Sequence, residues 1–599
     1  MVFELERIER IAKDLSESMY SDKASITTYE SYDGRDKPID ESKWETYETG
    51  SLWGGYDKYR WFKVNVIIPD RFKDKKVIFK ITTGHEGEWD ALNPQFLIYV
   101  NGKIVQGLDV NHREITLSEK AEPGKEYIIE LLGYSGLYER KVMISTDLYV
   151  LDREIESLYY DIKVPASIAE LLEENDDNRI KLLNKLGQAI DILDLREIYS
   201  EEFYDSLHVS RKYLKEELYT NVNYDNPLVT AIGHTHIDVA WLWTIAQTKE
   251  KTIRSFSTVL NLMKEYPEYK FMSSQPQLYE YVKENEPELY EEIKERIKEK
   301  RWEVDGAMWL EADCNIPSGE SLIRQIIFGH KFFKDEFNIE SKSLWLPDVF
   351  GYSAALPQIL KKSGIEYFMT TKLDWNQFNM IPNDTFTWRG IDGSEVLTYL
   401  VTTSDYRKAG GVSFNEQRNK TTYTGIINPN QVMGTWKRYQ NKNLSSETLM
   451  LFGYGDGGGG PTKEMLENAR RLKFGLPGCP RVDIGFETEF FHRLRENVKE
   501  SKELPTWVGE LYLEYHRGTY TSIGKNKRHN RKGEVLLQDL ETLYSINKEI
   551  GGEYPKKNIN KAWKTLLLNQ FHDIIPGSSI KQVYEDSDKQ YEEMFNRCE

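Results

Sequence analysis

Cysteine is scarce in this chain, and its scarcity is the first constraint on the class of protein. The 599 residues include three cysteines, Cys314, Cys479 and Cys598, at spacings that match no metal-binding or redox motif. A sparse and odd set of cysteines excludes the disulfide framework that small secreted domains use. We therefore expect a cytoplasmic protein.

Long apolar runs and long basic runs are also missing. No stretch of about 18 consecutive apolar residues occurs, which argues against a transmembrane helix. The formal net charge is -18, which disfavours binding to nucleic acid or to an anionic membrane. Residues 1–20 are charged throughout, so they predict an amphipathic helix rather than a signal peptide. Its apolar residues recur at helical spacing: Leu5, Ile8, Ala12, Leu15 and Met19.

Four regions with different patterning predict a multidomain α/β protein. Residues 1–154 hold the N-terminal helix and then short β-branched and aromatic segments, which indicate a β-sandwich. Residues 155–227 have helical spacing and predict a helical linker. In residues 228–486 strands and helices alternate, which predicts a parallel, α/β-barrel-like catalytic domain. Residues 487–599 are helical again and predict a helical-bundle segment.

Aromatic residues are abundant, at 13% of the chain. This is a mild indication of sugar binding, because the apolar face of a pyranose ring stacks on aromatic side chains; a large aromatic core is the alternative. Within the sandwich, Asn101-Gly102 between two apolar runs predicts a β-hairpin. We interpret the sandwich as a structural cap rather than a sugar-binding module, since no candidate site residues stand out in it.

Residues 228–244, LVTAIGHTHIDVAWLWT, are the stretch around which the sequence is organised. A short apolar run is followed by His234, His236 and Asp238, which are common metal-ligand types. Side chains two apart in an extended segment point the same way, so His236 can share an ion with either neighbour. We predict a buried parallel strand that opens into a metal site; inert histidines at a strand end are the alternative.

Acidic residues follow other predicted strands of the same region. They are Glu311 and Asp313 after strand 302–306, Asp348 after strand 343–346 and Asp456 after strand 449–453. Parallel α/β folds place their sites at the carboxyl ends of strands, so we expect these residues on one face. The glycine run 457–460 lacks the Gly-Lys-Ser/Thr of a phosphate loop and predicts close approach of a substrate to Asp456.

Two further predictions concern the layout of this region. We expect one helix over residues 277–300, and we interpret strand 398–402 with the loop to about residue 440 as an insertion. Beyond it, His572 and Asp573 stand at the end of an apolar helical run closed by Pro576-Gly577. This pair either caps the helix or returns a missing ligand to the site.

Two imidazoles and two carboxylates from these segments suit a zinc-like ion and leave room for oxygen ligands from a polyol. The set is His236, Asp238, Asp313 and His572. Asp456 then remains as an acid outside the metal shell. This combination suits glycosidic cleavage, in which one carboxylate attacks the anomeric carbon and the other protonates the leaving oxygen. Trp241 would offer a stacking face for the sugar.

Six segments in order resemble the retaining α-mannosidases of glycoside hydrolase family 38, in their bacterial and cytosolic branch. They are GHTHIDVAWLW, GAMWLEADCNIPSGES, SLWLPDVFGYSAALPQIL, GYGDGGGGP, EYHRGTYTS and NQFHDIIPGSS. The resemblance runs from about residue 220 to the C-terminus, and the N-terminal region also fits that branch.

The resemblance implies one divalent ion, zinc foremost with cobalt as an alternative, and a mannose-containing oligosaccharide as substrate. The implied metal ligands match His236, Asp238, Asp313 and His572. Asp313 is implied as the nucleophile, and we assign the acid/base role to Asp456. The implied sugar contacts are Trp241, Asp348 and Asp573, and we add Arg324 as a residue that reaches the site.

One departure from the family concerns length. Family members normally continue past the His-Asp helix into large β-domains, whereas this sequence ends at Glu599. We expect exposed apolar surface for that reason, and association with a second copy or with a complementary C-terminal chain.

Two rival functions follow from the same residues. A His-x-His motif after a first strand also resembles metal-dependent amidohydrolases, but those need two more histidines at later strand ends, and His330 lies inside a predicted helix. The second rival is a truncated sugar- or metal-binding remnant without turnover, and hydrolysis would distinguish the enzyme from it.

Overall fold

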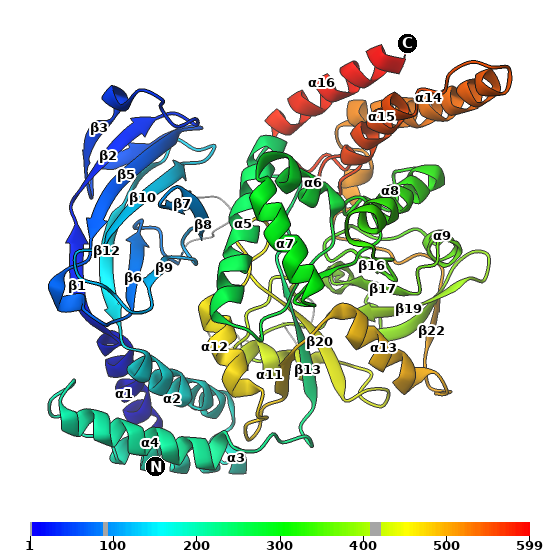
Figure 1. Cartoon of the computed structure of the whole chain (residues 1–599). Helices are drawn as coiled ribbons and strands as arrows, with labels where there is room; N and C mark the ends of the chain where they lie inside the picture. The colour runs from blue at the N-terminus through cyan, green and yellow to red at the C-terminus, as the bar shows by residue number, and fades with distance from the viewer. Residues whose placement is uncertain (1–2, 88–93, 408–420, 599) are drawn as a thin grey trace.

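The computed structural model describes residues 3–87, 94–407 and 421–598. Figure 1 shows a β-sandwich beside an α/β domain, with helices α1–α4 below the sandwich and helices α14–α16 along the top of the α/β domain. This arrangement confirms the predicted multidomain α/β class. Across the described ranges, no helix combines the length and the apolar character needed to cross a membrane.

The sandwich consists of two antiparallel sheets. One runs in the order β1 (Tyr20–Ile26), β12 (Ser145–Leu151), β6 (Val77–Thr82) and β9 (Glu114–Ser118). The other runs β3 (Glu45–Glu48), β2 (Thr28–Asp33), β5 (Tyr59–Ile67), β10 (Glu126–Tyr134), β7 (Gln95–Val100) and β8 (Lys103–Leu108). A short pair, β4 (Leu52–Gly54) and β11 (Lys141–Met143), lies beside them. Phe62, Phe79 and Leu131 are fully buried in the core between the sheets.

The hairpin predicted at Asn101-Gly102 is confirmed, since β7 and β8 pair antiparallel around it. Both turn residues have positive φ, 51° and 77°, which is the conformation that asparagine and glycine tolerate best. The next loop of this sheet, at the end of β8, runs toward the α/β domain.

Three helices connect the sandwich to the α/β domain, and the N-terminal helix packs against two of them. The N-terminal helix is α1 (Glu4–Ser18), and the other three are α2 (Arg153–Leu171), α3 (Asp177–Asp191) and α4 (Glu201–Leu218). The amphipathic helix predicted at the N-terminus is confirmed, with Ile8, Ala12 and Leu15 buried. The side chains of Asp152 and Ser200 cap the backbone N–H groups at the starts of α2 and α4.

The first sheet of the α/β domain is parallel throughout. It is formed by β15 (Trp302–Val304), β14 (Phe271–Ser273), β13 (Leu228–His234) and β20 (Glu447–Phe452), with β21 (Arg481–Ile484) also paired to β13. The helices of the domain are α5 (Ile245–Glu265), α6 (Pro276–Asn285), α7 (Pro287–Lys298), α8 (Gly319–Phe337), α9 (Leu356–Lys362), α11 (Pro429–Arg438), α12 (Lys463–Leu472) and α13 (Glu487–Val498). Helix α5 lies on the side that faces the sandwich, against β8 (Figure 1).

The second sheet is mixed, whereas the sequence predicted parallel strands throughout this barrel-like domain. Its order is β16 (Ser343–Trp345), β17 (Tyr367–Thr370), β19 (Glu395–Leu400), β18 (Thr385–Arg389) and β22 (Thr506–Val508). Strand β18 runs antiparallel to β19. A parallel bridge between Gly306 and Leu344 connects this sheet to the first one.

The predicted insertion after residue 398 is wrong, because β19 pairs with both β17 and β18 and belongs to the middle of the sheet. Residues 408–420 of that stretch lie outside the described residues. The single helix predicted over 277–300 is also wrong. Pro287 begins α7, because proline has no N–H to continue α6 and is favoured in a first helical turn.

Three helices follow the α/β domain: α14 (Gly524–Glu549), α15 (Lys556–Leu568) and α16 (Lys581–Cys598). The turn between α15 and α16 bridges back to the α/β domain, where Phe571 pairs with Ala312. This contact carries the next residue, His572, into the interior.

Buried carboxyl groups gather where β15 meets the start of α13. The carboxylate of Glu303 accepts the backbone N–H of Glu487 at 2.8 Å, and Asp305 accepts that of Gly306 at 2.6 Å. Burial raises the pKa of Glu303 to about 7 and that of Asp305 to about 6. Burial, with the nearby charges of Asp305 and Glu303, raises the pKa of Glu487 well above its ordinary value.

This cluster predicts a pH-dependent effect for Glu487→Gln. The folded chain keeps a proton on Glu487 that the unfolded chain releases near its ordinary pKa of 4.5, so wild-type stability falls as the pH rises above that value. Glutamine carries no such proton. The variant should gain stability over wild type at pH 8, on the order of 1–3 kcal/mol, and little at pH 4.

Thermal melting of both proteins at the two pH values measures this effect. Glu489→Gln, an exposed position on the same helix, is the matched control and should change little. An equal gain at both pH values would contradict the assignment.

Candidate functional site

The carboxyl end of β13 enters a buried polar cluster. His236 and Asp238 follow the strand, and each has about 1% of its surface exposed. With Asp348 and His572 they form a group whose ligand atoms all lie within 4.8 Å of one another. The strand-end prediction therefore placed three of its residues correctly in space, and the pair at 572–573 does return to the site.

Glu311 orients both histidines of the cluster. Its carboxylate Oε2 lies 3.1 Å from Nδ1 of His236, and its backbone carbonyl lies 2.8 Å from Nδ1 of His572. With Nδ1 of each ring turned to Glu311, Nε2 of each ring faces Asp238, at 3.0 Å from His236 and 3.4 Å from His572. For His572, the hydrogen bond between Nδ1 and a carbonyl is the arrangement by which proteins fix the tautomer of a metal-binding histidine.

The charges of the cluster fit a divalent cation. Burial alone would lower the pKa of His572, but the carboxylates of Asp238 and Asp348, 3.4 and 3.6 Å from its Nε2, raise it to about 10. The pKa of His236 is also raised, since the charges of Glu311 and Asp238 outweigh burial. The raised pKa values of these two buried imidazoles show that the carboxylates around them give the site an excess of negative charge. A bound cation can offset that charge in place of the protons, and a set of imidazole and carboxylate ligands suits zinc and related ions.

Asp313 lies beside this cluster and is not one of its four members. Its Oδ1 accepts backbone N–H groups from Asn315 at 2.9 Å and Ile316 at 2.7 Å. The charge of His572 acts on it, although burial is the larger influence and raises its pKa. The structure thus groups Asp348, which was expected as a sugar contact, with His236, Asp238 and His572.

A cavity of about 350 Å³ opens next to the cluster. Five predicted residues line it: Asp238, Trp241, Asp348, Asp456 and Asp573. Seven other lining residues were not singled out from the sequence: Phe350, Lys372, Trp375, Tyr423, His516, Thr519 and Ser578. Aromatic walls with a few converging charged groups are typical of sites for small polar ligands such as sugars.

Lys372 supplies the positive charge of the cavity wall. Its ammonium group forms an ion pair with Asp348 and lies 4.2 Å from the ring centre of Trp375. Burial would raise the pKa of Asp348, but Lys372 and His572 hold it below its ordinary value. Lys372 closely follows β17, so the strand-end rule could have found it. Tyr423 lies on a loop without such a signal, whereas His516 lies in EYHRGTYTS, one of the segments that carry the family resemblance.

Asp456 has the character of an acid. Burial and the charge of Asp238 raise its pKa to about 7, and the hydroxyl of Tyr423 donates to its Oδ1 at 3.0 Å. Its φ is 52°, in the left-handed region, which costs a non-glycine residue on the order of 1–3 kcal/mol. Such a conformation persists only where the surroundings hold it.

The structure does not bring Arg324 into the cavity. Its guanidinium forms ion pairs with Glu320 and Glu541 at 2.8 and 2.5 Å, and it packs over the ring of Trp563. These contacts hold α8 against α14 and α15. The prediction that Arg324 reaches the site is therefore wrong, because its guanidinium group is paired with Glu320 and Glu541 instead.

Three family models match successive parts of the chain. The glycosyl hydrolases family 38 N-terminal domain matches residues 226–510, the alpha mannosidase middle domain matches 514–599, and the alpha-mannosidase jelly roll domain matches 23–135. The chain belongs to glycoside hydrolase family 38. The family boundaries follow the architecture, with the jelly roll model on the sandwich and the middle-domain model on the C-terminal helices.

Two curated relatives match most of the length of this chain. The chain is 34% identical to the alpha-mannosidase of Saccharomyces cerevisiae, over 88% of this chain and 49% of that protein. It is 33% identical to alpha-mannosidase G of Dictyostelium discoideum, over 99% of this chain and 54% of that protein. The chain thus spans about half the length of the curated relatives it matches.

A solved structure supports the fold. The crystal structure of an alpha-mannosidase from Enterococcus faecalis V583 matches with a TM-score of 0.51 at 19% identity, over 62% of this chain and 41% of that chain.

The cluster predicts metal binding that depends on His572. His572→Ala removes an imidazole whose Nε2 faces two carboxylates, so zinc affinity should fall by about 100-fold or more. Metal analysis after dialysis against a competing chelator measures the loss. His516→Ala is the control, because His516 lines the cavity but is no member of the cluster, and it should bind zinc normally. Undiminished affinity in His572→Ala would contradict this site.

Proposed function

We propose that this chain is a metal-dependent retaining α-mannosidase, which removes terminal α-D-mannosyl residues from oligosaccharides through a covalent glycosyl-enzyme intermediate. The observation that carries the proposal is the buried cluster of His236, Asp238, Asp348 and His572, open to a cavity with an aromatic wall and a carboxyl group of raised pKa. Family membership, and the names of relatives that cover most of this chain, support the choice of mannose.

Asp313 is the proposed nucleophile and Asp456 the proposed acid/base. A carboxylate oxygen of Asp313 attacks the anomeric carbon as the bond to the leaving oxygen breaks, and Asp456 gives its proton to that oxygen. Asp456 then takes a proton from water, which attacks the same carbon and releases mannose and the carboxylate of Asp313. The raised pKa of Asp456 supports its protonated state at the start of the cycle.

Residues of the cavity would hold the sugar. Trp241 and Trp375 offer aromatic faces to the pyranose ring, and Asp348, Lys372 and Asp573 offer charged partners for its hydroxyl groups. Asp313 keeps a place among the proposed metal ligands with His236, Asp238 and His572, as the family resemblance implies. When bound, a divalent ion, zinc foremost, would supply positive charge that stabilises the transition state.

A cytoplasmic location is part of the proposal. Cys314, Cys479 and Cys598 are all free, and the first two are buried. Free, sparse cysteines are typical of reducing compartments.

The first test is hydrolysis of 4-nitrophenyl α-D-mannoside by the chain with zinc, after chelation, and after zinc is restored. We expect release that chelation abolishes and zinc restores, with α-mannose as the first product observed by NMR. Asp313→Ala should reduce turnover by about 10⁴-fold or more, because it removes the nucleophile. Tight zinc binding without hydrolysis would instead favour a sugar- or metal-binding protein without turnover, and β-mannose as product would reject the covalent intermediate.

The second test concerns the proton of Asp456. Since Asp456 must be protonated to act and its pKa is about 7, kcat/KM should fall as the pH rises above 7. Asp456→Asn should lose about 100-fold or more on methyl α-mannoside, whose leaving group needs a proton, and much less on 2,4-dinitrophenyl α-mannoside. Zinc content serves as the control and should not change. Equal losses on both substrates would show that Asp456 is not the acid.

A further inference from the structure

The loop that carries Asp456 is built from residues with unusual backbone angles. Gly453, Gly457, Gly459 and Gly460 all have positive φ, between 85° and 133°, in addition to Asp456 itself. A loop of this composition has many alternative conformations when free, because glycine restricts the backbone least. The carboxyl group of Asp456 therefore has a fixed position only if contacts hold the loop.

On its inner side, the loop is tied to the segment that carries the metal-cluster residues. The N–H of Gly457 donates to the carbonyl of His236 at 3.3 Å, and the hydroxyl of Thr235 donates to the carbonyl of Tyr454 at 3.1 Å. Tyr454 and Gly460 exchange two backbone hydrogen bonds that close the base of the loop. These hydrogen bonds hold the inner side of the loop next to His236. The outer side of the loop makes none of them.

On its outer side, the loop meets the β-sandwich. His112, in the loop after β8, has its Nε2 3.0 Å from the carbonyl oxygen of Pro461. Its Nδ1 lies 3.0 Å from Oδ1 of Asp109, which also accepts the backbone N–H groups of Asn111 and His112. Both ring nitrogens therefore face oxygen atoms, Nδ1 that of Asp109 and Nε2 that of Pro461. His112 is 6% exposed, and the contact joins residues 349 positions apart in the chain.

The fit between the two loops is close. A Cβ atom added to Gly459 would lie 2.8 Å from Oδ2 of Asp109 and 2.8 Å from Nδ1 of His112. Only a glycine allows the two backbones to approach this closely. The sandwich loop thus forms one wall of the space that the Asp456 loop occupies.

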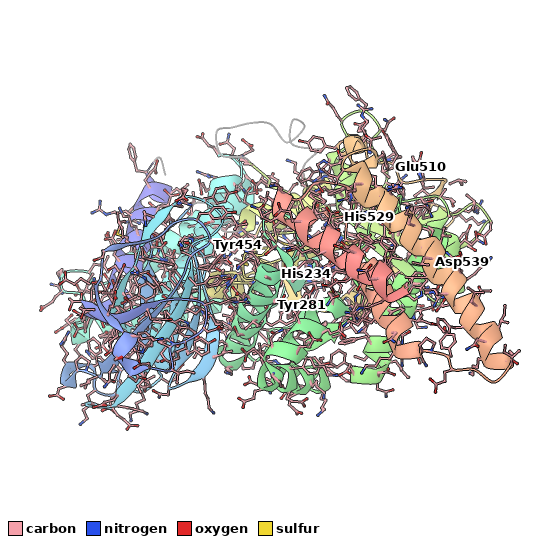
Figure 2. All side chains as sticks on the ribbon, turned by 90° about the horizontal axis from the view of Figure 1, so that it is seen from above. His234, Tyr281, Tyr454, Glu510, His529 and Asp539 are labelled. Atoms are coloured by element: carbon pink, nitrogen blue, oxygen red, sulfur yellow. The ribbon has the colours of Figure 1, made fainter. Side chains whose placement is uncertain are left out.

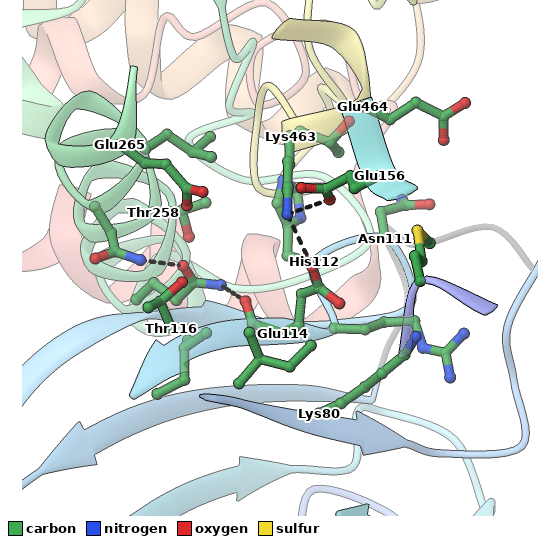
Figure 3. Close-up of a pocket in the computed structure, with 18 of the residues that line it drawn as sticks. Lys80, Asn111, His112, Glu114, Thr116, Glu156, Thr258, Glu265, Lys463 and Glu464 are labelled. Carbon is green, nitrogen blue, oxygen red and sulfur yellow. Dashed lines mark hydrogen bonds and ion pairs between the residues drawn. The ribbon is translucent and has the colours of Figure 1, made fainter. Parts of the chain in front are cut away.

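A pocket of about 410 Å³ lies beside this contact, between the sandwich and helices α2, α5 and α12. His112, Asn111, Lys463 and Glu156 are among the residues drawn around it in Figure 3. Figure 2 places Tyr454 on the side of the α/β domain that faces the sandwich. The pocket interrupts the packing of the two domains here. Two side chains contact the loop from outside it: Lys251 of α5 packs against Gly457, and His112 of the sandwich faces the carbonyl of Pro461.

We propose that His112, oriented by Asp109, is a positioning residue that fixes the loop of Asp456 and so sets how well that carboxyl group protonates a leaving group. The sandwich is then part of the catalytic apparatus and more than the structural cap that the sequence indicated. This inference rests on the proposed function, since it assigns Asp456 the role of the acid.

Hydrogen exchange tests the fixing of the loop without any turnover. In His112→Ala, amides in residues 453–462 should exchange about tenfold faster or more than in wild type. His112→Gln keeps a side-chain N–H that can reach Pro461 and should restore most of the protection. The matched control is Asn261→Ala, which removes the 2.8 Å hydrogen bond from Asn261 to Gln106 across the same domain interface without touching the loop. Its loop should exchange as in wild type.

Comparison of leaving groups tests the consequence for catalysis. His112→Ala should lose about tenfold or more kcat/KM on methyl α-mannoside relative to its loss on 2,4-dinitrophenyl α-mannoside. The ratio is independent of how much of the variant is folded, because misfolded protein lowers both rates equally. His112→Gln should recover the ratio, and Asn261→Ala should keep that of wild type.

Either of two results would overturn the inference: unchanged exchange of the loop in His112→Ala, or equal losses on both substrates. A wild-type chain that hydrolyses neither mannoside would contradict the proposed function separately, while the exchange experiment would still decide whether His112 fixes the loop.

Discussion

The site depends on the double contact of one residue, Glu311, with two histidines from opposite ends of the α/β architecture. Its side chain turns His236 and its backbone turns His572, so both Nε2 atoms face the same carboxylates. The two rings therefore face the carboxylates of the cluster at the place where a cation would offset their negative charge. The C-terminal turn that holds His572 is therefore as necessary to the site as β13, and the short bridge between Ala312 and Phe571 brings the two together.

The electrostatics divide the buried carboxyl groups into two kinds. Asp238 and Asp348 have pKa values below the ordinary range, because histidines or Lys372 offset the cost of burial. Asp456 and Asp573 have pKa values of about 7, because burial and the neighbouring carboxylates outweigh nearby positive charge. Anionic ligands and a protonated acid can thus coexist within one small cavity, which is what cleavage of a glycosidic bond requires.

The sequence predicted well wherever a local rule applied. Apolar strands that end in polar residues located His236, Asp348 and Asp456, since parallel strands share one carboxyl edge. Predictions from the sequence failed where the structure is set by a contact between residues far apart in the chain. Nothing local distinguishes β19 from an inserted strand until its partners are known. Arg324 was expected to reach the site because the sequence does not show that its ion-pair partner, Glu541, comes from another helix.

The contact between the sandwich and the glycine-rich loop has a consequence for the evolution of substrate specificity in such a protein. His112 and Asp109 belong neither to the metal cluster nor to the lining of the cavity, yet they adjoin the loop of Asp456, the proposed acid. Substitutions in the sandwich could therefore alter which glycosidic bonds are cleaved, with the sugar-recognising residues left intact. Substrate range would then be adjustable from the sandwich, none of whose described residues lines the proposed sugar cavity.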